Sequence, residues 1–166
     1  GKPVPHKFKI GISGCANNCI KAEENDVGIK GWIEPLWSPD SCTRCRLCEA
    51  VCPSKVVRIP DGPGVEAVDL SGCVGCGDCV AVCPTGAMEE GARGCRIFVG
   101  GKFGRMPFLG KRALGVLRTP EEILAAVRAV VAFFREHGRP KERFGDTLQR
   151  LGFRSLEDEL EERTGL

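Results

Sequence analysis

The chain has 166 residues, of which 24 are basic, 22 are acidic and 11 are cysteines, and 42% are hydrophobic. This composition is typical of one globular domain, or of a small domain that carries an insert, and excludes wholesale disorder. A net charge of +2 predicts neither a nucleic-acid nor a membrane partner, and the longest apolar run, Ala129 to Phe134, is far shorter than the roughly 20 residues that span a bilayer. We therefore expect a cytoplasmic protein whose reduced cysteines bind metal rather than form disulfides.

The first predicted element is a strand over residues 7–13, where Phe8, Ile10 and Ile12 alternate with polar or small residues at the period of a strand. Residues 27–33 and 96–99 predict two further strands on either side of a cysteine-rich window. We infer that the window, residues 35–90, is inserted into a host domain formed by residues 1–34 and 91–166.

Two cysteines, Cys15 and Cys19, follow the first strand, and Cys95 lies after the window. Spacing alone leaves Cys15 and Cys19 open, because two cysteines four residues apart are either buried small side chains or part of a ligand set. Cys95 is expected to face a core.

The window holds two copies of Cys-x2-Cys-x2-Cys-x3-Cys-Pro, separated by two short apolar runs, Val56 to Ile59 and Val65 to Leu70. This spacing is typical of bacterial two-cluster ferredoxins, in which the fourth cysteine of each copy binds the other [4Fe-4S] cluster. It assigns one cluster to Cys42, Cys45, Cys48 and Cys83, and the other to Cys73, Cys76, Cys79 and Cys52. The alternative is a pair of four-cysteine zinc sites, for which paired Cys-x2-Cys units across a longer gap are more typical. Clusters held entirely by thiolates predict one-electron transfer rather than catalysis within the window.

The segment between Gly91 and Pro120 is basic and rich in glycine. It has seven basic residues and no acidic one: Arg93, Arg96, Lys102, Arg105, Lys111, Arg112 and Arg118. Close backbone approach at its glycines and the forked donors of Arg105 suit an anionic ligand. The alternative is a solvated basic face or a weak nucleic-acid patch.

The last third of the chain is predicted to be helical. Thr119, Pro120 and Glu122 form a capping signal for a helix that ends before Gly138. A second helix from about Lys141 ends at Gly152, and a third is expected to start after Ser155 with Asp158 completing its cap. Their apolar stripes indicate core packing, and His6 and His137 are interpreted as structural. The fold class expected from these elements is α+β.

The residues from His6 to Cys19, with the sequence HKFKIGISGCANNC, resemble the sirohaem-dependent sulfite and nitrite reductases, as do Glu24 to Ile29 and Gly100 to Pro107. The resemblance implies a mixed sheet with C-terminal helices. It also implies that Cys15 and Cys19, with Asn17 between them, belong to a site in which Cys19 links a [4Fe-4S] cluster to the sirohaem iron. Lys102 and Arg105 are the residues best suited to hold the sirohaem carboxylates or the anionic substrate. The ferredoxin-like insert is similar to that of the dissimilatory and anaerobic sulfite reductases.

The upstream Cys-x5-Cys pair of this family does not precede Cys15. We therefore expect the C-terminal part of a longer reductase, with sirohaem and a third, coupled cluster only in the full-length protein. The insert would relay electrons from a donor protein or subunit for the six-electron reduction of sulfite, or of nitrite, and oligomers are compatible with this role. The alternative is a stand-alone ferredoxin-type electron-transfer protein without catalytic activity, in which Cys15 and Cys19 are free thiols.

Overall fold

The computed structural model describes residues 3–61 and 68–166, so the predicted apolar run from Val65 lies partly outside the described residues. The chain forms two compact units. The larger unit comprises residues 1–31 and 94–166, and the smaller unit comprises residues 32–93. The chain passes from the larger to the smaller unit within strand β2 (Val27–Trp37) and returns within strand β3 (Met88–Val99).

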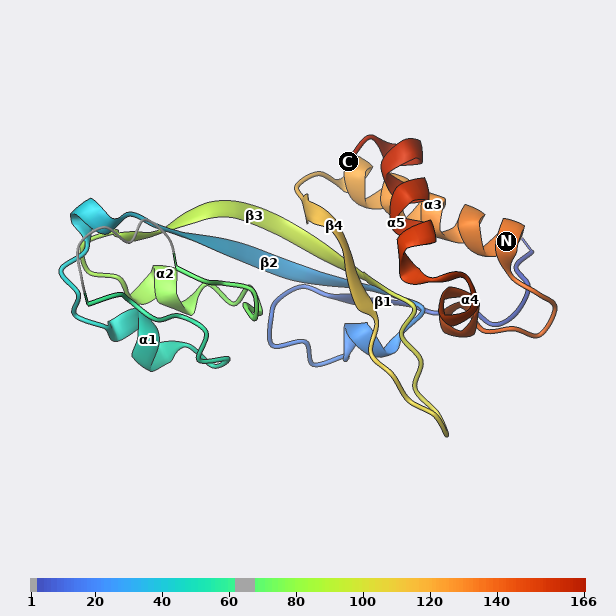
Figure 1. Cartoon of the computed structure of the whole chain (residues 1–166), viewed down its shortest axis with the longest axis horizontal. Coiled ribbons are helices and arrows are strands. Elements are labelled where there is room, and N and C mark those ends of the chain that lie inside the picture. The colour runs from blue at the N-terminus through green and yellow to red at the C-terminus, as the bar shows by residue number, and fades with distance from the viewer. Residues whose placement is uncertain (1–2, 62–67) are drawn as a thin grey trace. The chain divides into compact units, whose positions relative to one another are not determined.

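Four strands form one sheet in the order β1-β2-β3-β4, with β1 at Ile10–Ser13 and β4 at Lys111–Leu117 (Figure 1). Strand β1 runs parallel to β2 and β3 runs antiparallel to β4, so the sheet is mixed. Together with the C-terminal helices, this confirms the predicted α+β class. Strands β2 and β3 are both longer than their predicted apolar runs. In β3, the additional residues include the polar, glycine-containing segment from Glu89 to Gly94.

The faces of β1 differ from what its apolar alternation indicates. Gly11 and Ser13 point inward, whereas Ile10 and Ile12 are 48% and 65% exposed. A side chain at Gly11 would meet the Asn25 amide, since an added Cβ would lie 2.4 Å from its nitrogen. The position of β1 therefore depends on the close approach of the segment at Asn25 rather than on burial of its isoleucines.

Helices α3 (Pro120–His137), α4 (Phe144–Leu151) and α5 (Phe153–Thr164) complete the larger unit. The capping box of α3 is confirmed, because Thr119 accepts a hydrogen bond from the Glu122 N–H and Glu122 accepts one from the Thr119 N–H. The predicted start of the third helix after Ser155 is wrong. Helix α5 begins at Phe153, and the Ser155 hydroxyl donates to the Leu151 carbonyl, four residues back, as it does inside a helix.

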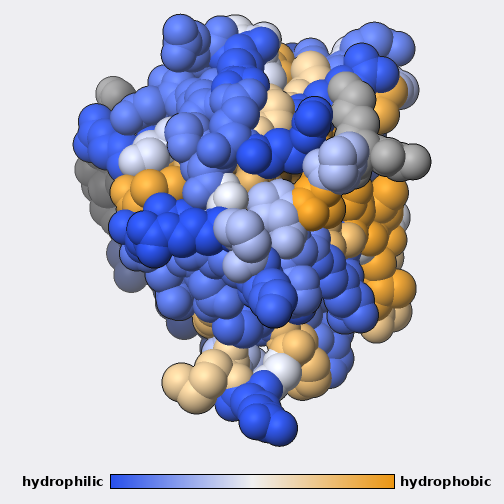
Figure 2. Space-filling model, turned by 90° about the vertical axis from the view of Figure 1, so that its right-hand side faces the viewer, coloured by the Kyte–Doolittle hydropathy of each residue, from blue (hydrophilic) through white to orange (hydrophobic). Residues whose placement is uncertain are grey.

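The core of the larger unit lies between the sheet and these helices. Phe133, Phe134 and Phe144 are buried, and Phe8 packs against the rings of Phe134 and Phe144 with centroids 5.6 and 5.5 Å apart. Figure 2 looks onto the side at the right of Figure 1 and shows a mostly hydrophilic surface there, as expected for helices whose apolar residues face a core.

The smaller unit contains two five-residue helices, α1 (Leu47–Val51) and α2 (Asp78–Val82), which pack together. Short 3-10 turns lie at Pro39–Ser41 in this unit and at Ala22–Glu24 in the larger one. The core of the smaller unit is formed by a few apolar side chains and two cysteines: Trp37, Val57, Ile59, Met88, Cys48 and Cys79.

Within the described part of the chain, none of the helices has the length and apolar character needed to cross a membrane.

Candidate metal centre

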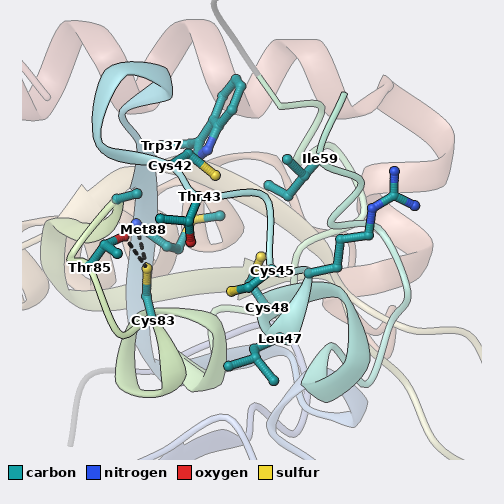
Figure 3. A pocket seen from close by; sticks show the side chains of 12 residues that line it. Trp37, Cys42, Thr43, Cys45, Leu47, Cys48, Ile59, Cys83, Thr85 and Met88 are labelled. Atoms are coloured by element: carbon teal, nitrogen blue, oxygen red, sulfur yellow. Dashed lines mark hydrogen bonds between the residues drawn. The ribbon is translucent and has the colours of Figure 1, made fainter. Parts of the chain in front are cut away.

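Four cysteines of the smaller unit line one pocket, and they come from both copies of the motif. Cys42, Cys45 and Cys48 belong to the first copy, and Cys83 is the last cysteine of the second. Figure 3 shows their sulfur atoms around a common space. This is the grouping that the spacing assigns to one cluster, although the metal that they bind stays a prediction.

The backbone around this pocket is shaped by residues with positive φ. Arg44 and Arg46 adopt the left-handed conformation at φ 55° and 59°, so the loop from Cys42 curls before α1 begins at Leu47. Helix α1 then places Cys48 in the core, where it is 8% exposed. Cys45 lies on the exposed loop.

The second copy of the motif has the same local structure. Gly75 and Gly77 take left-handed conformations, and α2 follows with Cys79 buried in its first turn. Cys73, Cys76 and Cys79 interact electrostatically with one another. Cys52, the fourth residue assigned to this set, packs against the same core.

Burial and mutual proximity disfavour unpaired thiolates at several of these positions. Burial raises the pKa of the Cys48 thiol, with smaller contributions from Cys42 and Cys83. It raises the pKa of the Cys79 thiol to about 11, and the neighbouring Cys76 and Cys73 add to the effect. Grouped thiols of this kind fit a cationic metal centre, because metal ions compensate the negative charge of several thiolates at once.

The last cysteine of each copy receives hydrogen bonds. At Cys83, burial raises the pKa, but the Met88 N–H, 3.3 Å from Sγ, and groups at Thr85 lower it by more (Figure 3). At Cys52, burial also raises the pKa, and N–H groups at Val57 and its neighbours, with the Ser54 hydroxyl, outweigh it. Both thiols therefore have a pKa below the ordinary value. Donors around sulfur are a feature of iron-sulfur sites.

The spacing of the thiols differs from that in a zinc site. Over residues 3–61 and 68–166, the only three ligand atoms of His, Cys, Asp or Glu found within 4.8 Å of one another belong to Glu136, His137 and Glu159. A tetrahedral zinc ion with bonds of about 2.3 Å holds its sulfurs about 3.8 Å apart. No three of the eight thiols are that close.

The group of Glu136, His137 and Glu159 has a structural role. Arg163 forms ion pairs with both carboxylates, and His137 Nε2 lies 3.1 Å from Glu159 Oε2. These contacts join α3 to α5. Cys95 packs against the core of the larger unit, also as predicted, and burial raises the pKa of its thiol.

Cys15 and Cys19 are exposed on the loop after β1 in the larger unit. Asn18 organises this loop: it adopts a left-handed conformation, its Oδ1 accepts from the Ala22 N–H at 2.8 Å, and its amide donates to Glu23. The loop lies close to β2, because an added Cβ at Gly31 would be 2.2 Å from the Gly14 carbonyl oxygen. Asn17, between the two cysteines, is also exposed.

Sequence reasoning missed the ion pair that supports this loop. Lys30 Nζ lies 2.7 Å from Glu23 Oε1, and both side chains are largely buried. Burial raises the pKa of Glu23, but the hydrogen bond and the charge of Lys30 act in the opposite direction, together with other hydrogen bonds. The pKa of Glu23 therefore lies below its ordinary value. The only signals in the sequence are a lysine within an apolar strand and an asparagine suited to positive φ.

The middle of the basic segment, residues 100–110, forms a hairpin beside the turn at Ala22–Glu24, and the flanking parts belong to β3 and β4. Lys102 and Phe108 exchange backbone hydrogen bonds of 3.0 and 2.9 Å. The Gly110 N–H donates to the Glu23 carbonyl at 2.7 Å, and an added Cβ at Gly101 would be 2.1 Å from the same oxygen. The structure thus brings the hairpin next to the segment that follows Cys19.

The two cationic residues singled out on this hairpin have different environments. Lys102 Nζ lies 2.8 Å from Asp146 Oδ1 on α4, so its charge is already paired. Arg105 is exposed at the tip. Asp146 is a second residue that sequence reasoning missed, because 44 residues separate the partners.

Comparisons with known proteins give consistent results over the whole chain. The family model for the nitrite and sulphite reductase 4Fe-4S domain matches residues 1–166. The coenzyme F420-dependent sulfite reductase of Methanocaldococcus jannaschii is 32% identical over 163 residues, which are 97% of this chain and 26% of that protein. The alpha subunit of the dissimilatory-type sulfite reductase of Allochromatium vinosum is 26% identical over 90% of this chain and 40% of the subunit.

The chain thus spans less than half the length of these reductases. An uncharacterized ferredoxin of Methanocaldococcus jannaschii is 30% identical over 79% of this chain, and the match covers 82% of that protein. Among solved structures, dissimilatory sulfite reductase I has a similar fold, with a TM-score of 0.63 and 21% identity over 95% of this chain and 43% of the other.

Proposed function

Given that this chain belongs to the nitrite and sulphite reductase 4Fe-4S domain family, we propose that it forms the electron-relay part of a sirohaem-dependent sulfite or nitrite reductase. The observation that carries the proposal is the pocket of Cys42, Cys45, Cys48 and Cys83, in which the last cysteine of one motif joins the first three of the other. Crossed pairing of this kind is what two-cluster ferredoxins require.

In this proposal, residues 35–90 form a ferredoxin-type insert whose eight cysteines hold two [4Fe-4S] clusters. The clusters would supply one-electron transfer. The chain's own part is to hold them in fixed positions and to set their electrostatic surroundings. N–H groups aimed at sulfur, such as Gly75 toward Cys73 at 3.3 Å and Met88 toward Cys83 at 3.3 Å, stabilise negative charge there.

In the larger unit, we assign Cys15, Cys19 and Asn17 to the cofactor site of the intact reductase, with Cys19 as the thiolate shared with the sirohaem iron. The exposure of both thiols supports this role, because a ligand must be reachable by its metal. The hairpin at residues 100–110 would provide cations for an anionic ligand. Arg105 is free to do so directly, whereas Lys102 would have to exchange Asp146 for that ligand.

The activity of the intact protein would be the six-electron reduction of sulfite to sulfide, or of nitrite to ammonia, with electrons from a donor protein or subunit. We place it in the cytoplasm, where thiols stay reduced. A second candidate is a stand-alone electron carrier without catalysis. The match to most of the length of the uncharacterized ferredoxin favours this candidate.

Metal analysis of protein purified without oxygen tests the proposal. We expect about eight irons per chain from two [4Fe-4S] clusters, without zinc. About thirteen irons with haem-type bands would indicate that the sirohaem centre also assembles. Zinc in place of iron would contradict both candidates.

Variants then test the ligand assignment. Cys48→Ala and Cys79→Ala should each lose about four irons, one cluster apiece. Cys95→Ala is the matched control, because Cys95 is a partly buried cysteine outside both sets, and it should keep all the iron. Unchanged iron in the first two variants would show that the assignment is wrong. Sulfite- or nitrite-dependent oxidation of a reduced carrier by the full-length protein separates the reductase from the stand-alone carrier.

A further inference from the structure

The two motif copies share three left-handed backbone positions but fill them with different residues. Each pair is related by the same offset of 31 residues that relates Cys42 to Cys73. In the first copy these positions are cationic, and in the second all three are glycine: Arg44, Arg46 and Lys55 against Gly75, Gly77 and Gly86. Glycine takes this conformation without strain, whereas side chains with a Cβ are disfavoured there.

Packing explains the glycines of the second copy. An added Cβ at Gly75 would lie 2.3 Å from the Trp32 indole, and one at Gly77 would lie 2.7 Å from Ile33 Cδ1. The Ile33 N–H also donates to the Gly75 carbonyl at 3.0 Å. Strand β2 therefore covers the second metal-binding loop, and both glycines are buried.

The corresponding loop of the first copy is open. Residues 43–47 are all exposed, including the ligand Cys45, and Leu47 is 44% exposed. Here the backbone strain is not imposed by a neighbouring side chain, and glycine would relieve it. Strain retained at an exposed position beside a metal centre indicates that the side chains themselves are used.

The charge around the two loops is opposite. Between Cys42 and Ile59 there are four cations, Arg44, Arg46, Lys55 and Arg58, and one anion, Glu49, which accepts a hydrogen bond from the Ile59 N–H at 2.6 Å. Arg46 forms an exposed ion pair with Asp61. Between Asp69 and Glu90 there are four carboxylates and no lysine or arginine.

We propose that the loop from Thr43 to Leu47 is the docking surface for an acidic electron-carrier protein, and that electrons enter at the cluster held by Cys42, Cys45, Cys48 and Cys83. This inference rests on the proposed function. Arg44 and Arg46 attract carboxylates around the partner's redox centre, and Leu47 supplies apolar contact. One electron would leave the reduced centre of the partner, which would be oxidised, and the cluster that Cys42, Cys45, Cys48 and Cys83 would hold would accept it, without bond formation or proton transfer.

The test uses the anaerobically purified, iron-loaded chain and an acidic flavodoxin as the electron donor. The double variant Arg44→Gly/Arg46→Gly removes both charges and introduces the residues that the second copy has at the same positions. We expect the second-order rate of cluster reduction at low ionic strength to fall about tenfold or more, and its dependence on salt to weaken. Photoreduced riboflavin, a small donor without a cluster of carboxylates, should reduce both proteins at nearly the same rate.

Two controls match the variant. Arg154→Ala removes an exposed cation of the larger unit and should leave the flavodoxin rate unchanged. Gly86→Lys, introduced into the double variant, restores a cation where an added Cβ meets nothing within 4 Å, but next to the second motif, and should not restore the rate.

The outcomes separate this inference from the proposed function. Absence of a reducible iron-sulfur cluster in the unmodified chain overturns both. Normal reduction by riboflavin with a flavodoxin rate that is the same in the double variant overturns the docking surface alone. A double variant that changes only the oligomeric state, with no change in rate, also overturns it, because the loop would then be a contact between subunits.

Discussion

Removal of the Arg143 guanidinium is expected to destabilise the larger unit strongly. The Asp26 carboxylate is fully buried and accepts hydrogen bonds from the Lys9 N–H at 2.9 Å and from Arg143 Nη2 at 2.7 Å. When one partner of a buried ion pair is removed, the remaining charge is uncompensated and about 3–5 kcal/mol of stability is lost. Since Lys9 still donates in Arg143→Met, we expect the lower end of the range, about 3 kcal/mol.

Substitution of the other partner, Asp26→Asn, should lower the free energy of unfolding by less. Arg143 is 19% exposed, so in Asp26→Asn its guanidinium is able to reach water, and the loss is about 1.5–3 kcal/mol for one charged hydrogen bond. The double variant Asp26→Asn/Arg143→Met should be little less stable than Asp26→Asn alone, because neither variant leaves a buried, uncompensated charge.

Thermal unfolding of the iron-loaded chain, followed by circular dichroism, measures these effects. A loss of 3 kcal/mol corresponds to a decrease in Tm of roughly 6–12 °C for a protein of this size. Arg154→Met is the control, because its ion pair with Asp158 is exposed and should contribute less than about 1 kcal/mol. A decrease for Arg143→Met no greater than that of the control would refute the reasoning.

Three further predictions concern pH, packing and capping. The hydrogen bond from Arg150 lowers the pKa of Glu142 to about 2 from an ordinary value of 4.5. The stabilising contribution of Glu142 is therefore complete above pH 4.5 and is lost as the pH falls toward 2. The Tm of Glu142→Gln should vary less with pH over that window than the Tm of the unmodified chain, and the same pH dependence in both would contradict this. Gly75→Ala and Gly86→Ala introduce the same left-handed strain, but only Gly75→Ala forces a Cβ into Trp32. We therefore expect Gly75→Ala to lose iron and Gly86→Ala to keep it. Equal iron losses in the two variants would count against the packing argument. Thr119→Ala removes the capping box of α3 and should lower stability by about 1 kcal/mol, measured as a decrease in Tm of about 2–4 °C, whereas no decrease would show that α3 does not depend on its cap.

Features that depend on neighbouring residues could be predicted from the sequence. The capping box at Thr119 and the end of α3 at His137 follow from a few adjacent side chains, and the structure has both. The motif spacing likewise predicts that Cys83 joins Cys42, Cys45 and Cys48, and these four residues line one pocket.

Features that depend on distant residues could not be predicted in the same way. The outward orientation of Ile12 is set by the close approach of Asn25 to Gly11, and the length of β3 by its pairing with other strands. The start of α5 at Phe153 was hidden because Ser155 is equally suited to a cap and to bonding the carbonyl four residues before it.

At the candidate sites, the sequence identifies chemical types but not their partners. Lys102 is visible as a cation for an anionic ligand, but its pairing with Asp146 depends on where α4 packs. The left-handed conformations of Arg44 and Arg46 do have a signal in the sequence, because superposing the two copies of the motif places them opposite Gly75 and Gly77.

The packing of Trp32 and Ile33 on the second copy gives the two halves of this internal duplication different freedom to change. At Gly75, a random library selected for iron binding would retain glycine, since every other residue adds an atom where the Trp32 indole already lies. At Gly77, the added atom meets the end of the Ile33 side chain, and the positive φ also favours glycine. At Arg44 and Arg46, the same library would accept asparagine, aspartate or glycine, because only the backbone conformation restricts iron binding there, whereas docking of the electron carrier requires the cations. A repeat that binds the same kind of metal centre twice can therefore diverge first at its backbone turns, while its cysteines stay the same.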